Sequence, residues 1–152
     1  QQIDLGFNYR MTDIQAVLGV SQANRLDDYI VRRRALAKRY DEYLTDLNVT
    51  LPWQHPSGRS AWHLYVIRLQ CEKISKTHRQ VFEALREQGI GVNLHYIPVH
   101  TQPYYQRLGF VKGDFPLAEA YYGEAISLPI YPGLKKKHQD RVINSLSVIL
   151  KS

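Results

Sequence analysis

The order of helical and extended patterns is the feature that most constrains the fold of this 152-residue chain. Apolar residues recur at spacings of three and four over residues 13–47, which is typical of the buried face of a long helix. After residue 60, short segments rich in β-branched and aromatic residues alternate with segments of helical period. This order predicts an α+β fold: a long helix, then a small antiparallel or mixed sheet with helices packed on one face.

Proline, glycine and capping residues mark the ends of the expected elements. Strands are expected at residues 61–69, 90–98 and 125–132. Helices are expected at residues 77–88, 116–124 and 135–150. Pro129 should shorten the last strand or place it at the edge of the sheet. We therefore divide the chain into residues 1–60, a leading loop, long helix and linker, and residues 61–152, a small α+β domain.

Polar side chains are concentrated at the entrance to the first helix, from Asn8 to Thr12. Thr12 and Gln15 form a capping-box pattern, so a helix should begin at the next residue. The free N–H groups and the positive dipole end of a first turn attract phosphate, and Asn8 and Arg10 carry donors for one. The residues alone leave open a second interpretation, an ordinary capped helix with a solvated Arg10.

Two histidines lie five positions apart across a proline, His95 and His100, beside several tyrosines. A zinc site needs three or four ligands, so we expect no metal here. Imidazole can donate to a sugar hydroxyl or to a phosphate, which makes a ligand-binding role the hypothesis and a surface loop the alternative. Ser127 and Tyr131, in the last expected strand, form a further polar group.

Composition narrows the function classes. The net charge of +6 comes partly from basic runs at residues 32–34 and 135–137, a pattern more typical of solvated helix faces than of a nucleic-acid stripe. Cys71 is the only cysteine, which excludes an intrachain disulfide and fits a cytoplasmic location. The sequence contains neither a membrane-length apolar run nor a signal peptide, and no nucleophile motif or lysine in an apolar setting.

The whole chain resembles one family. GFNYRMTDIQAVLGVSQ (residues 6–22) is followed in order by AWHLYVIRL, GIGVNLHYIPVHTQPYYQRLGF and FPLAEAYYGEAISLPIYPGL. This series of motifs resembles the C-terminal part of the sugar aminotransferases of the DegT/DnrJ/StrS type. GIGVNLHYIPVH is most similar to the branch that aminates UDP-linked keto-deoxy amino sugars, as in the pseudaminic acid pathway.

The resemblance implies a cofactor, a reaction and a missing domain. The family consists of homodimeric pyridoxal phosphate (PLP) enzymes of the aspartate aminotransferase fold, with the active site at the subunit interface. They move an amino group from glutamate to a nucleotide-linked 4-keto-6-deoxy sugar, for polysaccharide and glycan biosynthesis at the cell surface. The lysine that holds PLP lies in an upstream domain that this sequence lacks, so we expect a C-terminal domain that is inactive alone and contains no catalytic residue.

The resemblance also implies roles for single residues. Asn8 matches the asparagine that reaches the cofactor phosphate held by the other subunit. Arg10, with Tyr9 beside it, matches a position near the phosphates of the nucleotide sugar, while His95 and His100 match a loop at the edge of the substrate pocket. For the tyrosines, packing at an interface remains the alternative. A free-standing RNA-binding domain or a purely structural α/β domain is the alternative for the whole chain, although we expect no nucleic-acid or membrane partner.

Overall fold

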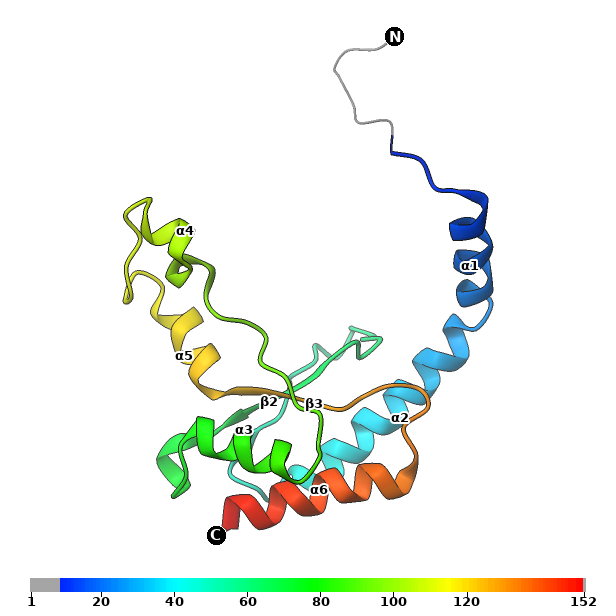
Figure 1. Ribbon diagram of the computed structural model, residues 1–152. Coiled ribbons are helices and arrows are strands. Elements are labelled where there is room, and N and C mark those ends of the chain that lie inside the picture. The colour runs from blue at the N-terminus through cyan, green and yellow to red at the C-terminus, as the bar shows by residue number, and fades with distance from the viewer. Residues whose placement is uncertain (1–8, 152) are drawn as a thin grey trace.

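The computed structural model describes residues 9–151 of the chain (Figure 1). The helices of this range are α1 (Asp13–Ala23), α2 (Leu26–Leu44), α3 (His78–Glu87), α4 (Pro103–Gln106), α5 (Pro116–Glu124) and α6 (Lys136–Lys151). The strands are β1 (Val49–Thr50), β2 (Tyr65–Leu69) and β3 (Ala125–Leu128), and the short 3-10 helices are η1 (Cys71–Lys73) and η2 (Val99–Thr101). This composition confirms the predicted α+β class. Within the described range, none of the helices combines the length and the apolar character that a membrane crossing requires.

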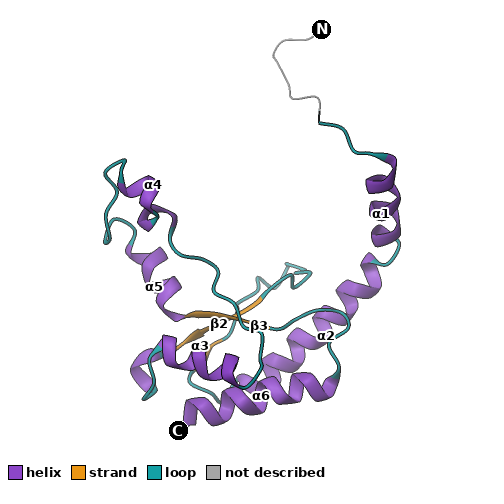
Figure 2. Cartoon of the chain, viewed as in Figure 1, coloured by secondary structure: helices purple, strands orange, loops and turns teal. Residues whose placement is uncertain are grey.

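The three strands form an antiparallel sheet in the order β1-β2-β3. Tyr65 lies opposite Leu128 and Ile67 opposite Ile126, so these four side chains share one face of the sheet, and all four are buried. Helices α2, α3 and α6 supply most of the other core residues and lie together on one side of β2 and β3 (Figure 2). The expected packing of helices on one face is therefore what the structure shows.

The predicted continuous helix over residues 13–47 is wrong, because α1 ends at Ala23 and α2 begins at Leu26. The break lies at Asn24 and Arg25, where Arg25 leaves the helical conformation (φ −108°, ψ 1°). The Arg25 guanidinium turns back and donates to the carbonyl and the hydroxyl of Ser21 at 3.2 and 3.1 Å. The bond to the Ser21 carbonyl satisfies one of the backbone acceptors that the end of α1 leaves free.

All three predicted strands are longer than the structure shows, and two of them differ for reasons other than a proline at their end. Residues 90–98 form no strand; Asn93 pairs with Ser127 in an isolated bridge. The pairing does not extend further in either direction. On one side it would reach Pro129, which has no N–H to donate. On the other side it would reach Ala125, whose carbonyl is already 3.0 Å from His78 Nε2. The strand predicted at residues 61–69 begins only at Tyr65.

The ends of the helices predicted after residue 60 lie within one residue of the observed ones, and the strand expected at residues 125–132 is shortened at Pro129, as expected. Pro116 is the first residue of α5, and β3 ends at Leu128, directly before Pro129. Thr77 caps α3 in a reciprocal capping box with Gln80. Proline and capping residues act through their nearest neighbours in the chain, which explains why sequence alone located these ends.

The interpretation of both basic runs as solvated helix faces is half right. Residues 135–137 are exposed, as expected. The guanidinium groups at positions 32–34 instead donate to backbone carbonyls of two distant loops, at residues 59–63 and 130–134. The run therefore attaches these loops to α2.

Two projections extend from the core (Figure 1). One is α1, which contains no buried residue. The other consists of residues 98–124, which include η2, α4 and α5; we term it the arm. In Figure 1, α1 and α4 lie on opposite sides of the space above the sheet. The core itself includes Tyr40 of α2 and Val49 of β1 together with the elements that follow residue 60.

Candidate functional site

The entrance to α1 carries the predicted capping box. Gln15 N–H donates to Thr12 Oγ1 at 3.3 Å, and Thr12 N–H donates to Gln15 Oε1 at 2.9 Å. Tyr9, with 90% of its surface exposed, and Arg10, also exposed, precede the cap residue Thr12 by three and two positions. Asn8, the predicted contact to the cofactor phosphate, lies outside the described residues. A helix N-terminus flanked by an exposed guanidinium is an arrangement that favours an anion.

His95 lies on the sheet, next to β3. The backbone bonds between Asn93 and Ser127 align the segment with β3, at 2.9 and 3.3 Å. His95 Nδ1 is 2.6 Å from the Ser127 hydroxyl, and the imidazole meets the Tyr96 ring edge to face, with centroids 4.6 Å apart. Ser127 lies opposite Val66, on the face of the sheet that does not carry Ile126 and Leu128. His95 therefore lies on the face turned away from α2, α3 and α6.

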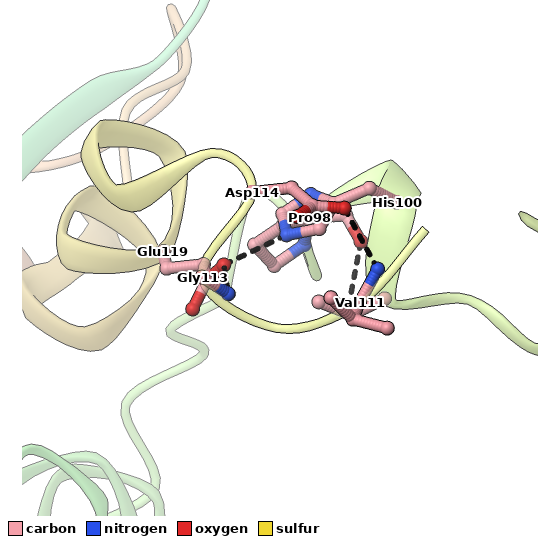
Figure 3. Close-up of polar contacts among 7 residues, drawn as sticks. Pro98, His100, Val111, Gly113, Asp114 and Glu119 are labelled. Atoms are coloured by element: carbon pink, nitrogen blue, oxygen red, sulfur yellow. Dashed lines mark hydrogen bonds and ion pairs between the residues drawn. The ribbon is translucent and has the colours of Figure 1, made fainter. Parts of the chain in front are cut away.

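His100 lies inside the arm. Its side chain is only 6% exposed, and its Nε2 is 2.8 Å from Glu119 Oε1 (Figure 3). The same carboxylate oxygen accepts the Gly113 N–H at 2.6 Å. The Phe115 ring packs beside the imidazole, with centroids 4.9 Å apart. The Gly113 N–H, and then His100, lower the pKa of the Glu119 carboxyl. These contacts fasten the loop between α4 and α5 to η2 and to α5.

The structure separates the predicted site residues into three places. Tyr9 and Arg10 precede α1, His95 faces β3, and His100 faces Glu119 within the arm. Neither hydrogen-bond partner of the two histidines, Ser127 or Glu119, follows from a sequence motif. Ser127 is one of the polar residues of the last expected strand, and its contact with His95 arises because both side chains lie on the same face of the sheet. Glu119 carries no such signal, because it lies 19 positions along the chain from His100, beyond α4 and the irregular segment that follows it.

An apolar hollow of about 370 Å³ lies in the arm, lined by Val99, His100, Tyr105, Phe110, Phe115 and Ala118. A second, larger hollow of about 650 Å³ lies beside α2 and contains Trp53, Trp62, Lys38 and Arg59 among its lining residues. Neither hollow includes His95 or the entrance to α1. In the described part of the chain, no three His, Cys, Asp or Glu side chains are grouped so that they could hold a metal ion.

Known proteins similar to this chain include aminotransferases and a polysaccharide biosynthesis protein. SpsC of Bacillus subtilis, a spore coat polysaccharide biosynthesis protein, is 40% identical over 149 residues, which is 96% of this chain and 38% of SpsC. PseC of Helicobacter pylori, an aminotransferase involved in the biosynthesis of pseudoaminic acid, has a TM-score of 0.86 and 27% identity. That match covers 99% of this chain and 40% of PseC.

A third protein connects the fold with the cofactor. Spr1654 of Streptococcus pneumoniae, solved in a PLP form, has a TM-score of 0.85 and 27% identity over 93% of this chain and 36% of that protein. The chain thus spans less than half the length of each of these three proteins. The model of the DegT/DnrJ/EryC1/StrS aminotransferase family matches residues 1–147. With nearly every residue inside that match, the chain belongs to the DegT/DnrJ/EryC1/StrS aminotransferase family.

Proposed function

We propose that this chain is the C-terminal part of a PLP-dependent aminotransferase that transfers an amino group from glutamate to a UDP-linked 4-keto-6-deoxy sugar. The product would serve polysaccharide or glycan biosynthesis at the cell surface, and the enzyme would be a cytoplasmic homodimer. The observation that carries this proposal is the match to PseC over 99% of this chain, together with the family match over residues 1–147. The relative SpsC adds the link to polysaccharides.

The described residues offer groups that suit a phosphate, but no lysine that is placed to hold the aldehyde of PLP. The entrance to α1 offers the positive end of a helix and an exposed Arg10, both of which suit a phosphate. A Schiff-base lysine needs an enclosed pocket that lowers its pKa. Every lysine of residues 9–151 is exposed or half-buried, so we propose that this lysine belongs to the part of the enzyme that the chain does not span.

Each predicted site residue then has a defined task. PLP, when bound, carries the amino group between donor and acceptor. Asn8 would donate its amide N–H to the PLP phosphate of the other subunit, and Arg10 and Tyr9 would bind the phosphates of the nucleotide sugar. His95 would donate from Nε2 to the sugar. For His100, the bond to Glu119 favours a supporting role within the arm.

The test compares two neighbouring positions in the complete enzyme. Asn8→Ala should weaken PLP affinity roughly ten- to a hundredfold, because a hydrogen bond to a charged group contributes about 1.5–3 kcal/mol. Thr12→Ala is the matched control, since the Thr12 hydroxyl is already engaged in capping α1. PLP titrated into both apo-variants and followed by absorbance gives the affinities. Equal PLP affinity in Asn8→Ala and the parent would contradict the phosphate role of Asn8.

A further inference from the structure

We propose that Ser127 is a positioning residue that holds His95 as the Nε2–H tautomer and thereby keeps one imidazole donor available to the sugar. The tautomer is inferred from the contacts of Ser127 and His95. The substrate contact rests on the function proposed above. The two parts make separate predictions, so each can fail on its own.

The position of Ser127 is fixed by the sheet. Ser127 is the third residue of β3, is only 5% exposed, and exchanges both backbone hydrogen bonds with Asn93. His95 is two residues beyond Asn93, so in an extended segment both side chains lie on the same face of the sheet as the Ser127 hydroxyl. The 2.6 Å distance between Ser127 Oγ and His95 Nδ1 shows that the two side chains do meet there.

The tautomer of His95 follows from the hydrogen bond that the Ser127 hydroxyl donates. A serine hydroxyl carries one hydrogen and donates it to the acceptor that lies within reach. In the described part of the chain, the Ser127 hydroxyl has hydrogen-bond geometry to His95 Nδ1 alone. Nδ1 therefore accepts, and the neutral imidazole carries its proton on Nε2. Because Nε2 is on the far edge of the ring, its N–H is directed away from Ser127.

A fixed Nε2–H donor suits a substrate whose surface presents many acceptor oxygens. Sugar hydroxyl, carbonyl and phosphate oxygens all accept hydrogen bonds. The edge-to-face contact with Tyr96 restricts the ring further, with an interplanar angle of 81°. Without the Ser127 hydroxyl, His95 could adopt either tautomer and its ring could turn. The backbone bonds between Asn93 and Ser127 would remain. The expected effect is therefore on His95 and not on the fold.

The first experiment examines the tautomer in the 152-residue chain itself. Imidazole nitrogen shifts are recorded by ¹⁵N NMR at about pH 8.5, well above the ordinary imidazole pKa of about 6.5. The His95 signal is assigned with His95→Gln. We expect the parent to show Nε2–H alone, Ser127→Ala to shift toward a mixture of tautomers, and Ser127→Thr to restore the parent pattern. Ser145→Ala is the matched control, because Ser145 is a similarly buried serine on α6, at 8% exposure. An Nδ1–H signal in the parent, or no shift in Ser127→Ala, would overturn the tautomer.

The second experiment measures kinetics in the complete holoenzyme with a UDP-linked 4-keto-6-deoxy amino sugar and glutamate. Ser127→Ala should raise KM for the sugar about three- to tenfold, as loss of a neutral hydrogen bond does, and leave KM for glutamate unchanged. His95→Gln should raise it at least as much, and Ser127→Thr should restore it. If His95→Gln raises KM and Ser127→Ala does not, the positioning role is wrong and the proposed function stands. If neither changes KM, the substrate role proposed for His95 is wrong.

Discussion

At the scale of single residues, the side chain of Arg33 organises more of the fold than any local pattern indicated. One of its nitrogens, Nη1, donates to the carbonyls of Trp62, His63 and Ile130 at 2.9, 3.2 and 3.0 Å. Trp62 has a φ of 51°, a left-handed conformation that is unfavourable for a tryptophan. The bond from Arg33 and the packing of Trp62 on the Tyr65 ring, with centroids 5.6 Å apart, stabilise this conformation.

We therefore expect Arg33→Met to lower the free energy of unfolding by roughly 1.5–3 kcal/mol, the range for hydrogen bonds that involve a charged group. Lys38→Met on the same helix is the control. The Lys38 side chain is 79% exposed and lies 3.9 Å from Glu42, so its loss should cost well under about 1 kcal/mol. Urea unfolding followed by circular dichroism gives both values. Equal losses in the two variants would mean that the three carbonyl contacts contribute little.

The buried tyrosines predict how stability depends on alkaline pH. Burial, followed by the hydrogen bond to Asp41, raises the pKa of Tyr65 far above its ordinary value, and burial likewise raises the pKa of Tyr40. A pKa raised in the folded state means that the unfolded chain loses its proton first. Stability is thus complete below about pH 10, the ordinary tyrosine pKa, and falls as the pH rises beyond it.

The expected loss is about 1.4 kcal/mol per pH unit for each of these two tyrosines. Tyr65→Phe should reduce the slope by one tyrosine, although it also breaks the 2.6 Å bond to Asp41 and lowers stability at every pH. Tyr43→Phe is the control, because Tyr43 is 56% exposed. Urea unfolding at several pH values between about 8 and 11 measures the slopes. An unchanged slope in Tyr65→Phe would show that Tyr65 titrates normally.

At the scale of elements, two identical capping boxes should have different effects on stability. Thr12 and Thr77 each accept a third-residue N–H at 3.3 Å. Helix α3 buries Val81 and Leu85 in the core, whereas α1 buries nothing. Thr77→Ala should lower the free energy of unfolding by about 1 kcal/mol. Thr12→Ala should reduce helical circular dichroism without shifting the midpoint of global unfolding. The same fall in midpoint for both variants would show that α1 is coupled to the core.

The carboxylate of Glu119 holds the arm together through its bonds to Gly113 and His100. Its pKa is lowered in the folded state, chiefly by the Gly113 N–H and then by His100. The stabilisation of the arm by the ionised Glu119 carboxylate is therefore present above the ordinary glutamate pKa of about 4.3. It is lost as the pH falls through the lowered pKa. Glu119→Ala should accelerate amide hydrogen exchange at Gly113 and leave the core unchanged, since the core cluster contains no residue of the arm. Glu87→Ala, which removes an exposed carboxylate from α3, is the control. Unchanged exchange at Gly113 would show that the carboxylate does not order the arm.

Sequence could predict those elements whose signals lie close together in the chain. Thr77 with Gln80, Pro116 and Pro129 located the ends of three elements correctly. The break at Arg25 was missed because a side chain that returns to Ser21 has no compositional signature. At the candidate site, His95 was predicted from sequence. Its partner Ser127 lies 32 positions away and could be identified only once the register of β3 was known. The roles of residues 32–34 were missed for the same reason, since their acceptors lie about 25–100 residues away.

At the scale of the whole molecule, one compact core carries two projections with exposed apolar surface. The core draws on segments from both ends of the chain, from Leu36 to Leu150. On α1, by contrast, large apolar side chains are exposed by 60–77%: Ile14, Val17, Leu18 and Val20. The apolar positions that predicted a buried helix face are thus present but uncovered in the chain alone. Exposed apolar surface of this extent is typical of an interaction site.

We therefore expect the 152-residue chain to self-associate through α1, in keeping with the homodimer proposed for the complete enzyme. Sedimentation equilibrium over a range of concentrations should show a mass above that of a 17.7 kDa monomer, increasing with concentration. Leu18→Lys places a charge on the apolar face and should weaken the association. Gln22→Lys adds the same charge at another exposed position of α1 and should have a smaller effect. A monomer at every concentration would contradict the prediction. Association that Leu18→Lys leaves unchanged would assign it to another surface, with the apolar hollow of the arm as the next candidate.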